Sequence, residues 1–254
     1  MRRELLEKQW YLEEEAAHIK GWDFSHIHGR YEEEEDLPWD YEGVIQSYRK
    51  DEMKILDLDT GGGEFLLSLG HPYKNLSATE AYPPNVELCK HKLLPLGIDF
   101  KEAVATKYLP YPNETFDMVI NRHGGFNEKE IYRVLKPNGL FITQQVGAEN
   151  DRGLVELLYS SLPDSPAPDN YLSITEQKFI DTGFMIMKGQ EAFRPIKFYD
   201  VGALVWFARI IEWEFPDFSV DKHLKELWKA QEILENKGRI EASIHRYMMV
   251  ARKD

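Results

Sequence analysis

Hydrophobic and polar positions along the middle of the chain form short apolar runs that alternate with helical patterns. Apolar runs of strand length predict strands, and apolar residues that recur every three or four positions predict helices. We expect strands over residues 54–58, 75–79, 98–104, 116–121 and 140–146. We expect helices from Glu64, over 86–94 with Asn85 as cap, and over 127–135 with Asn127 as cap. This alternation predicts a parallel, doubly wound α/β sheet.

The N-terminal region departs from this alternation. Residues 1–20 have the pattern of a charged amphipathic helix. A segment rich in aromatic and acidic residues follows, and we interpret its acidic run at 32–36 as a solvated loop. Trp22 and Trp39 lie in this segment, where we expect them to anchor an N-terminal arm, residues 1–49, to the core; the alternative is that the arm folds over a ligand pocket.

The pattern changes again after Gly147. In this part of the chain, helices are expected over residues 154–162, 173–182, 200–212 and 220–236, and strands over 185–193 and 240–251. A short helix is also expected over 43–48, ahead of the first strand. Residues 50–254 are therefore expected to form the main domain, in which residues 195–238 make a helical cap between the last two strands. With the arm, this cap is expected to cover a pocket.

Composition and charge narrow the class of protein. The chain has 254 residues, of which 43% are hydrophobic, so it is long enough to bury one α/β core with an appended cap. Its 31 Lys and Arg against 44 Asp and Glu give a net charge of −13, which disfavours a nucleic-acid partner unless a local basic groove exists. The single cysteine, Cys89, excludes an internal disulfide and a cysteine-rich zinc site, and we expect it to be a small buried residue.

Two kinds of targeting segment are also missing from the pattern. No apolar run approaches the length of a membrane span, and the first residues do not lead into a signal-peptide core. We therefore expect a cytoplasmic protein with no membrane partner.

No metal site is expected, because His26 and His28 lack a set of acidic partners and are interpreted as exposed loop histidines.

A glycine turn marks the first candidate site. The segment 54–67 reads as a buried strand, the glycines Gly61, Gly62 and Gly63, and the start of a helix. Glycines permit positive φ and a close approach of ligand to backbone, and a helix start offers free N–H groups. This predicts a small-molecule site at the carboxyl end of a strand. The spacing matches neither a dinucleotide fingerprint nor a phosphate loop, which disfavours a nucleotide-dependent oxidoreductase.

Over residues 50–150 the chain resembles the class I S-adenosylmethionine-dependent methyltransferases. In that family the first strand ends in an acid followed by glycines at alternate positions; residues 57–63 match, except that Asp59 stands where the first glycine is usual. The family has a ribose-binding acid at the end of strand two, and Glu80 stands there, 23 residues after Asp57. Residues 115–120 and 133–139 look like its strand-four block and the turn before strand five.

The resemblance implies a Rossmann-like, mostly parallel seven-stranded sheet with the last strand antiparallel. It also implies S-adenosylmethionine as cofactor. Ala105 stands where the family has an aspartate that contacts adenine, so the backbone of Ala105 and Thr106 is expected to make that contact. The positions that it assigns to the cofactor are Asp57, Asp59, Thr60, Gly61, Gly62, Gly63, Glu80, Ala81, Ala105, Thr106 and Asn121.

The candidate chemistry centres on the residues after the fourth strand. A methyl group on a sulfonium is electrophilic, so the protein mainly positions a nucleophile and needs a base only if the acceptor must lose a proton. His123 is the candidate general base, with a backbone or cofactor contact as the alternative. Arg122 is the candidate substrate contact, with a structural ion pair as the alternative. The Asn-Pro-Pro-Tyr signature of amino-group methylation is absent.

We therefore predict methyl transfer to a small or medium-sized organic substrate. Two alternatives stay open, an RNA base methyltransferase and a non-catalytic cofactor-binding module of the same fold. Aromatic residues in the cap region suggest an apolar substrate chamber, although helical spacing favours a core position for Trp206 and leaves loop-borne Phe215 and Phe218 as the better chamber candidates. These aromatics are Phe198, Tyr199, Trp206, Trp213, Phe215 and Phe218. The oligomeric state cannot be predicted from these patterns.

Overall fold

The computed structural model describes residues 2–19, 23–33 and 36–254 and divides into two compact units. The helical unit contains Met1–Leu37, Ala148–Asp169 and Phe193–His245, and the sheet unit contains Pro38–Gly147, Asn170–Ala192 and Arg246–Asp254. Trp22 lies outside the described residues, whereas Trp39 belongs to the sheet unit. The expected arm, main domain and cap are thus distributed over both units, and a pocket-covering role for the arm and cap stays a prediction.

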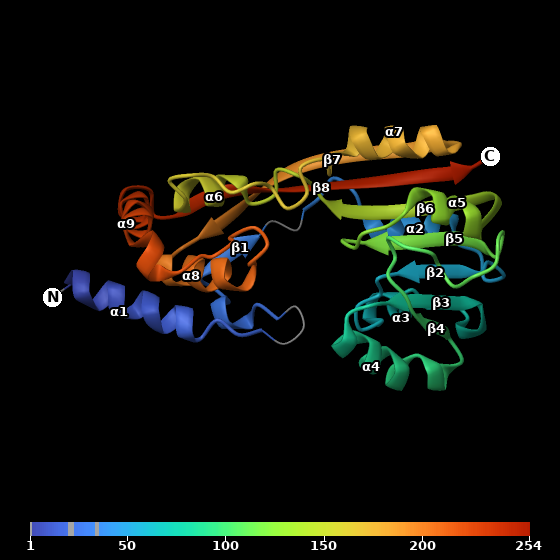
Figure 1. The fold of residues 1–254 in the computed structure, drawn as a ribbon, viewed down its shortest axis with the longest axis horizontal. Helices are drawn as coiled ribbons and strands as arrows, with labels where there is room; N and C mark the ends of the chain where they lie inside the picture. Colours follow the sequence, from blue (N-terminus) through green and yellow to red (C-terminus); the bar gives the residue numbers. More distant parts are fainter. Residues whose placement is uncertain (1, 20–22, 34–35) are drawn as a thin grey trace. The chain divides into compact units, whose positions relative to one another are not determined.

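The structure describes every residue of the sheet unit, and seven strands form its sheet. They are β2 (Ile55–Leu58), β3 (Leu76–Glu80), β4 (Asp99–Glu102), β5 (Phe116–Arg122), β6 (Leu135–Val146) and parts of β7 (Phe184–Phe198) and β8 (Ile240–Lys253). Their order is β7-β8-β6-β5-β2-β3-β4 (Figure 1). Strands β2 to β6 pair in parallel, and β8 is antiparallel to β6. The predicted Rossmann-like sheet with an antiparallel last strand is therefore confirmed.

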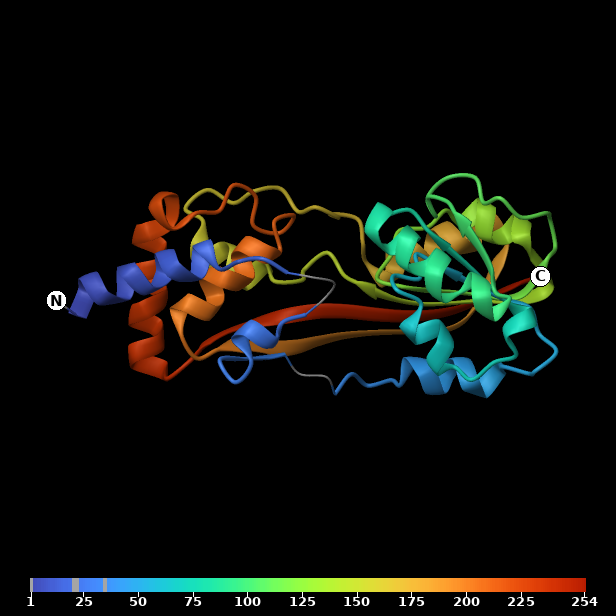
Figure 2. The same ribbon diagram turned by 90° about the horizontal axis from the view of Figure 1, so that it is seen from below.

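Helices cover this sheet on both faces, as apolar residues on both sides of its central strands require. All four residues of β2 are buried. On one face Phe141 of β6 stacks on Phe179 at 5.1 Å between ring centroids, in a cluster that includes Ile131 and Val134. The helices of this unit are α2 (Tyr41–Tyr48), α3 (Glu64–Ser68), α4 (Pro83–Lys92), α5 (Glu128–Val134) and α7 (Leu172–Thr182), with short turns η2 (Tyr73–Asn75) and η3 (Leu94–Leu96). Figure 2 shows α2 and α5 on opposite sides of the strands.

One of the two predicted helix caps is wrong. Asn127 caps α5 as expected, since its side-chain oxygen accepts the N–H groups of Lys129 and Glu130 at 3.0 and 3.2 Å. Asn85 lies inside α4, which begins at Pro83 because proline's fixed φ suits the first helical turn. The Asn85 amide instead lies 3.4 Å from a carboxylate oxygen of Glu80.

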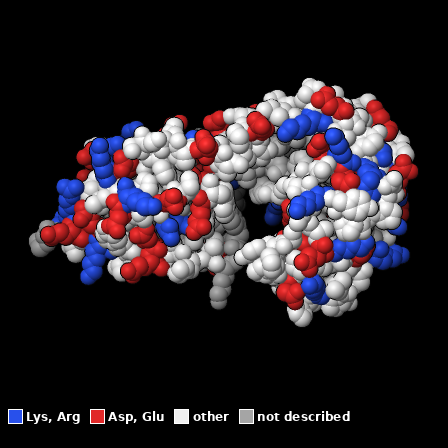
Figure 3. Space-filling model, viewed as in Figure 1, with Lys and Arg blue, Asp and Glu red and all other residues white. Residues whose placement is uncertain are grey.

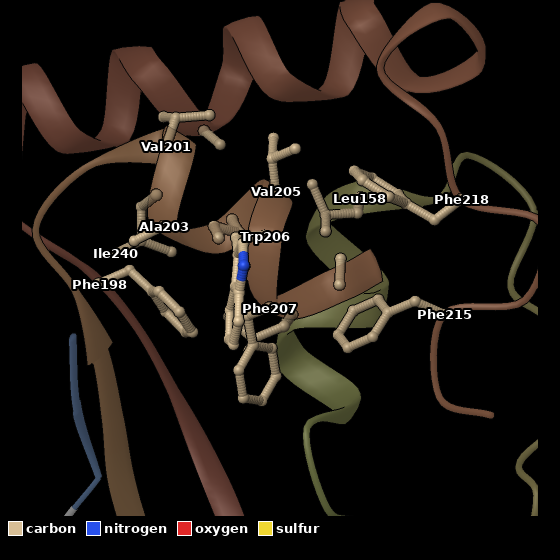
Figure 4. Packing of buried hydrophobic residues seen from close by; sticks show 14 of the residues in the cluster. Leu158, Phe198, Val201, Ala203, Val205, Trp206, Phe207, Phe215, Phe218 and Ile240 are labelled. Atoms are coloured by element: carbon tan, nitrogen blue, oxygen red, sulfur yellow. The ribbon is translucent and has the colours of Figure 1, made fainter. Parts of the chain in front are cut away.

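The helical unit has its own aromatic core. Its elements are α1 (Arg2–Glu15), η1 (Ser25–Ile27), β1 (Tyr31–Glu33), α6 (Arg152–Leu158), α8 (Val201–Ile210) and α9 (Val220–Lys237). Figure 4 shows Trp206 and Phe207 of α8 packed among side chains from other segments of the unit. Phe215 and Phe218 are each 1% exposed in this core, so the expectation that they line an open substrate chamber is wrong. They are packed instead because their loop folds back onto α8 and α6.

Part of the acidic run is a strand rather than the predicted loop. Residues Tyr31–Glu33 form β1, which pairs antiparallel with Ile196–Phe198 of β7 and adds an eighth strand. Alternation along the strand explains the difference, because Tyr31 packs on Phe198 at 5.8 Å while Glu32 points outward. Lys197 lies 3.9 Å from Glu32 and offsets its charge.

Charged side chains of both signs lie on the visible face of the molecule (Figure 3), with uncharged areas between them. Acidic and basic side chains are intermingled over the face drawn in Figure 3. In the described ranges, none of the helices combines the length and the apolar character needed to cross a bilayer.

Candidate functional site

Four loops that follow parallel strands meet at one edge of the sheet, as the carboxyl ends of parallel strands must. The loop after β2 touches the loop after β5, because a Cβ on Gly124 would lie 2.8 Å from the Asp59 carboxylate. The loop after β4 touches the same segment, since a Cβ on Gly125 would lie 2.8 Å from the Thr106 methyl group. Ala103 donates its N–H to the Glu80 carbonyl at 3.1 Å. The candidate residues of the sequence are therefore gathered in one place.

The glycine turn has the backbone that its sequence predicts. Gly61 and Gly63 have φ of +62° and +78°, in the left-handed region. Space beside Gly61 is open, whereas a Cβ on Gly63 would lie 2.8 Å from Leu93. Asp59 also has positive φ, at +52°. Aspartate tolerates this conformation better than most residues, so Asp59 preserves the turn that a glycine usually makes.

Glu80 ties the glycine turn to the end of β3. It is 6% exposed, and one carboxylate oxygen accepts the Gly61 N–H at 2.8 Å. The other accepts the N–H groups of Ala81 and Tyr82 at 2.8 and 2.9 Å. An ionised carboxylate has about four acceptor positions, and the fourth of these faces the Asn85 amide at 3.4 Å, a long contact that a ligand hydroxyl can replace. These hydrogen bonds fix the carboxylate beside the glycine turn.

The other two acids of the site are held in environments that favour their protonated forms. Burial raises the pKa of Asp57 to about 7, against the opposing effects of the Thr60 hydroxyl, which donates to it at 2.6 Å, and of Arg122. Burial and then the negative charge of Glu80 raise the pKa of Asp59 to about 6. Three carboxyl groups crowded at one turn favour a cationic ligand, because a positive charge relieves their mutual repulsion.

Asn121 acts within the framework of the site. Its side chain is fully buried and donates to the Leu58 carbonyl at 2.9 Å, while its oxygen accepts from the Gln145 amide at 2.6 Å. The Tyr41 hydroxyl donates to the Asn121 carbonyl at 3.0 Å. These bonds join β2, β5 and β6 just before the glycine turn. Asn121 therefore positions the turn, and a direct cofactor contact for it stays a prediction.

The loop after β4 supplies the two remaining cofactor candidates. Ala105 is 1% exposed and belongs to the core that contains Leu109. Thr106 is exposed, and its carbonyl accepts from the Asn127 side chain at 3.5 Å. The structure therefore leaves Thr106 at the surface against Gly125, and an adenine contact for its backbone stays a prediction.

Arg122 lies over an aromatic ring, and the substrate contact expected for it from the sequence stays a prediction. In the described part of the chain its guanidinium lies over the Phe65 ring, 4.7 Å from the centroid, and Phe65 stacks on Tyr41 at 5.4 Å. A ring face attracts a cation and keeps it accessible. The β5–β6 register pairs Arg122 with Gln144, so both side chains project from the same face of the sheet.

His123 has contacts that were not predictable from its position. It has φ of +62°, and its N–H donates to the Gln144 carbonyl at 2.9 Å. Its ring nitrogen Nε2 lies 3.1 Å from the Gln144 amide nitrogen, and the Trp39 indole donates to the Gln144 amide oxygen at 2.8 Å. Desolvation by the surrounding chain is the main cause that lowers the pKa of His123, and the positive charges of Arg246 and Arg122 lower it further. His123 nevertheless keeps some exposed surface.

Sequence reasoning missed Gln144 and Tyr41 altogether. A usable signal existed for Gln144, because two polar residues end the otherwise apolar run of β6 at the sheet edge where ligands bind. No comparable signal marked Tyr41, which reads as an ordinary helical aromatic.

Cys89 is a packing residue, as predicted. It is fully buried, and its thiol donates to the Gly61 carbonyl at 3.1 Å. Burial is the main cause that raises the pKa of Cys89 to about 11. A search of residues 2–19, 23–33 and 36–254 finds no group of three or more His, Cys, Asp or Glu side chains that could hold a metal ion.

Comparisons with known proteins agree with this geometry. Residues 56–143 match the family model of the methyltransferase domain. The chain is 34% identical over 118 residues to the demethylmenaquinone methyltransferase of Thermus thermophilus, a match that covers 42% of this chain and about half, 53%, of that protein.

Solved structures add the fold. The chain is similar to a candidate methyltransferase of Bacillus halodurans, with a TM-score of 0.59, 18% identity, and coverage of 84% of this chain and 98% of that one. It is also similar to the YcgJ protein of Bacillus subtilis, with a TM-score of 0.54, 18% identity, and coverage of 84% and 97%. At this identity the likeness concerns the fold alone.

Proposed function

We propose that this protein transfers a methyl group from S-adenosylmethionine to a small or medium-sized organic substrate, because residues 56–143 match the family model of the methyltransferase domain. When bound, the cofactor supplies a methyl group on a positively charged sulfur. The observation that carries the proposal is Glu80, whose carboxylate is fixed by three backbone N–H groups beside an open glycine turn. The proposal keeps the expectation of a cytoplasmic enzyme.

The residues of the site have separate tasks in this proposal. Glu80 accepts a hydrogen bond from a ribose hydroxyl, which takes the acceptor position that the Asn85 amide faces at 3.4 Å. Gly61 and Gly63 let the backbone approach the ligand, while Asp57 and Asp59 face its positively charged end. Thr106 lies where the adenine is expected. A small substrate fits the net charge of −13, which disfavours RNA.

Calorimetry with the full chain tests the proposal. We expect saturable binding of both S-adenosylmethionine and its demethylated product, because the ribose and adenine contacts are common to the two. Absence of heat for both ligands in folded protein would refute cofactor binding. Binding of both without methyl transfer to any acceptor would favour the non-catalytic module, and a mobility shift of RNA at low salt would favour the RNA methyltransferase.

Asp59 is expected to make cofactor affinity depend on pH. Its folded pKa of about 6 exceeds the unfolded value of about 4, so the ligand-free protein loses stability as pH rises from about 4 to 6, where the unfolded chain has released this proton and the folded state mostly holds it. Affinity for S-adenosylmethionine rises as the folded carboxyl ionises, around pH 6, because the carboxylate then attracts the sulfonium. The neutral thioether product shows a flatter profile. Calorimetry at about pH 5 and about pH 8 measures both trends.

Asp59→Asn is the matched variant for this prediction. We expect it to reduce the preference for the cofactor over the product by a factor of about ten at neutral pH, the effect of about 1.4 kcal/mol of charge attraction. It should also raise the melting temperature at high pH more than at low pH. Asp51→Asn, at an exposed turn, is the control that should change neither. An unchanged preference in Asp59→Asn would contradict an electrostatic role for Asp59.

A further inference from the structure

The contacts of the His123 ring determine which of its two nitrogen atoms carries the proton. An indole N–H only donates, so the Gln144 atom that receives it from Trp39 must be the amide oxygen. The Gln144 amide nitrogen, which only donates, then faces Nε2 of His123 at 3.1 Å. That Nε2 must accept and therefore carries no proton. A neutral imidazole with an unprotonated Nε2 has its proton on Nδ1.

The protonated Nδ1 is available to a ligand. Among the residues that the structure describes, the His123 ring has no hydrogen-bond partner besides Gln144, and His123 keeps exposed surface. The next residue, Gly124, packs directly against Asp59 of the glycine turn. His123 therefore lies within one residue of the proposed cofactor site. In this arrangement its free nitrogen is a donor, whereas a general base would need a free lone pair.

Two arginines lie near this donor. Arg122 precedes it in the chain, and the positive charges of Arg246 and Arg122 lower the pKa of His123, with desolvation as the larger cause. The Phe65 ring holds the Arg122 guanidinium while leaving the residue exposed. The carboxyl groups of Asp57 and Asp59 lie at the glycine turn, on the cofactor side. An N–H donor beside guanidinium charge suits a negatively charged oxygen.

We propose that His123 and Arg122 together bind an oxyanion of the methyl acceptor, so that the substrate is a phenol, an enol or a carboxylic acid that reacts as its anion. This inference rests on the proposed function and replaces the general-base role expected for His123 from the sequence. The acidic proton of the substrate passes to water on binding. The new bond to the methyl carbon then forms from an electron pair of the substrate anion, and the pair of the broken carbon–sulfur bond stays on sulfur.

Nitrogen-15 NMR of the histidines in the full chain tests the first step. We expect His123 with a protonated Nδ1 and an unprotonated Nε2 at neutral pH. In Gln144→Glu the carboxylate accepts from both Trp39 and His123, so the proton should move to Nε2 and the pKa of His123 should rise. Gln177→Glu, at an exposed position of α7, adds the same charge and should leave the His123 tautomer unchanged. A wild-type ring protonated on Nε2 would overturn the proposal.

A pair of probes tests the second step, in protein saturated with S-adenosylhomocysteine at about pH 8, where 4-nitrophenol is ionised. We expect 4-nitrophenolate to shift the His123 Nδ1–H signal and 4-nitroaniline, which has the same shape without the charge, to leave it in place. Gln144→Glu should weaken the nitrophenolate response by a factor of about ten. Equal responses to both probes, or none up to about 10 mM nitrophenolate, would contradict an oxyanion site.

The two proposals fail in different measurements. Calorimetry with the cofactor reports on Glu80 and the glycine turn, whereas the histidine tautomer is read in ligand-free protein. Normal cofactor binding with the wrong tautomer refutes the oxyanion site alone. The right tautomer without cofactor binding refutes the proposed function, and with it the inference.

Discussion

Replacing Glu80 by alanine is expected to weaken S-adenosylmethionine binding by a factor of about 10 to 10². The carboxylate would accept a ribose hydroxyl, and a hydrogen bond to a charged acceptor contributes about 1.5–3 kcal/mol, where 1.4 kcal/mol is tenfold in affinity. The substitution also leaves the N–H groups of Gly61, Ala81 and Tyr82 without their acceptor, which loosens the turn that receives the ligand. Calorimetry on the folded variant measures the loss.

A neighbouring acid provides the control for this variant. Glu102, at the end of β4, is an exposed carboxylate whose nearest cation, Lys90, lies 3.6 Å away. Glu102→Ala removes the same charge from the same sheet and should leave affinity within about twofold, since surface ion pairs contribute little. Circular dichroism separates a binding defect from unfolding. If folded Glu80→Ala binds the cofactor as tightly as Glu102→Ala, Glu80 does not bind the ribose.

Trp206→Ala is expected to lower the free energy of unfolding of the helical unit by about 3–5 kcal/mol, the range for deleting a buried large aromatic. The side chain is 1% exposed, stacks on His26 at 5.3 Å and meets Phe24 edge-on at 5.7 Å. Its indole N–H donates to the Ala16 carbonyl at 3.3 Å, and the deletion also removes this hydrogen bond. Urea unfolding followed by circular dichroism gives the change.

Trp213 is the matched tryptophan for this experiment. It lies in the same unit but is 53% exposed, so Trp213→Ala should change stability by about 0.5 kcal/mol or less. A loss below about 1 kcal/mol in Trp206→Ala would contradict a central packing role, because a buried tryptophan cannot be deleted without a cavity. An equally large loss of unfolding free energy in Trp213→Ala would show that the exposed fraction of a tryptophan does not indicate which one supports the core.

The central strands were predictable because burial on both faces leaves a continuous apolar run. The expected runs at 54–58, 75–79 and 116–121 agree with β2, β3 and β5 to within one residue at each end. The start of β6 was not predictable. Leu135 pairs with Phe116 before an irregularity in the register, so the strand begins ahead of the Lys-Pro-Asn-Gly turn that the sequence places before it.

Some residues of the site could be predicted from their neighbours in the sequence, whereas others depend on contacts between distant parts of the chain. The glycine turn and Glu80 follow directly on strands, where a motif can be read from neighbouring residues. The Trp39–Gln144–His123 contacts join residues separated by 105 and 21 positions, and no periodicity encodes which amide atom faces which ring. The helical unit was missed for a related reason, because it is assembled from three separate stretches of chain.

The buried thiol makes this protein a convenient subject for distance measurements. Cys89 is the sole cysteine of the chain, and its thiol is enclosed and held largely in the protonated form, which reacts poorly with maleimides and methanethiosulfonates. Cysteines introduced at exposed positions can therefore be labelled selectively without first removing the native one. One spin label in each unit would allow the separation of the helical and sheet units to be followed in solution, with and without cofactor.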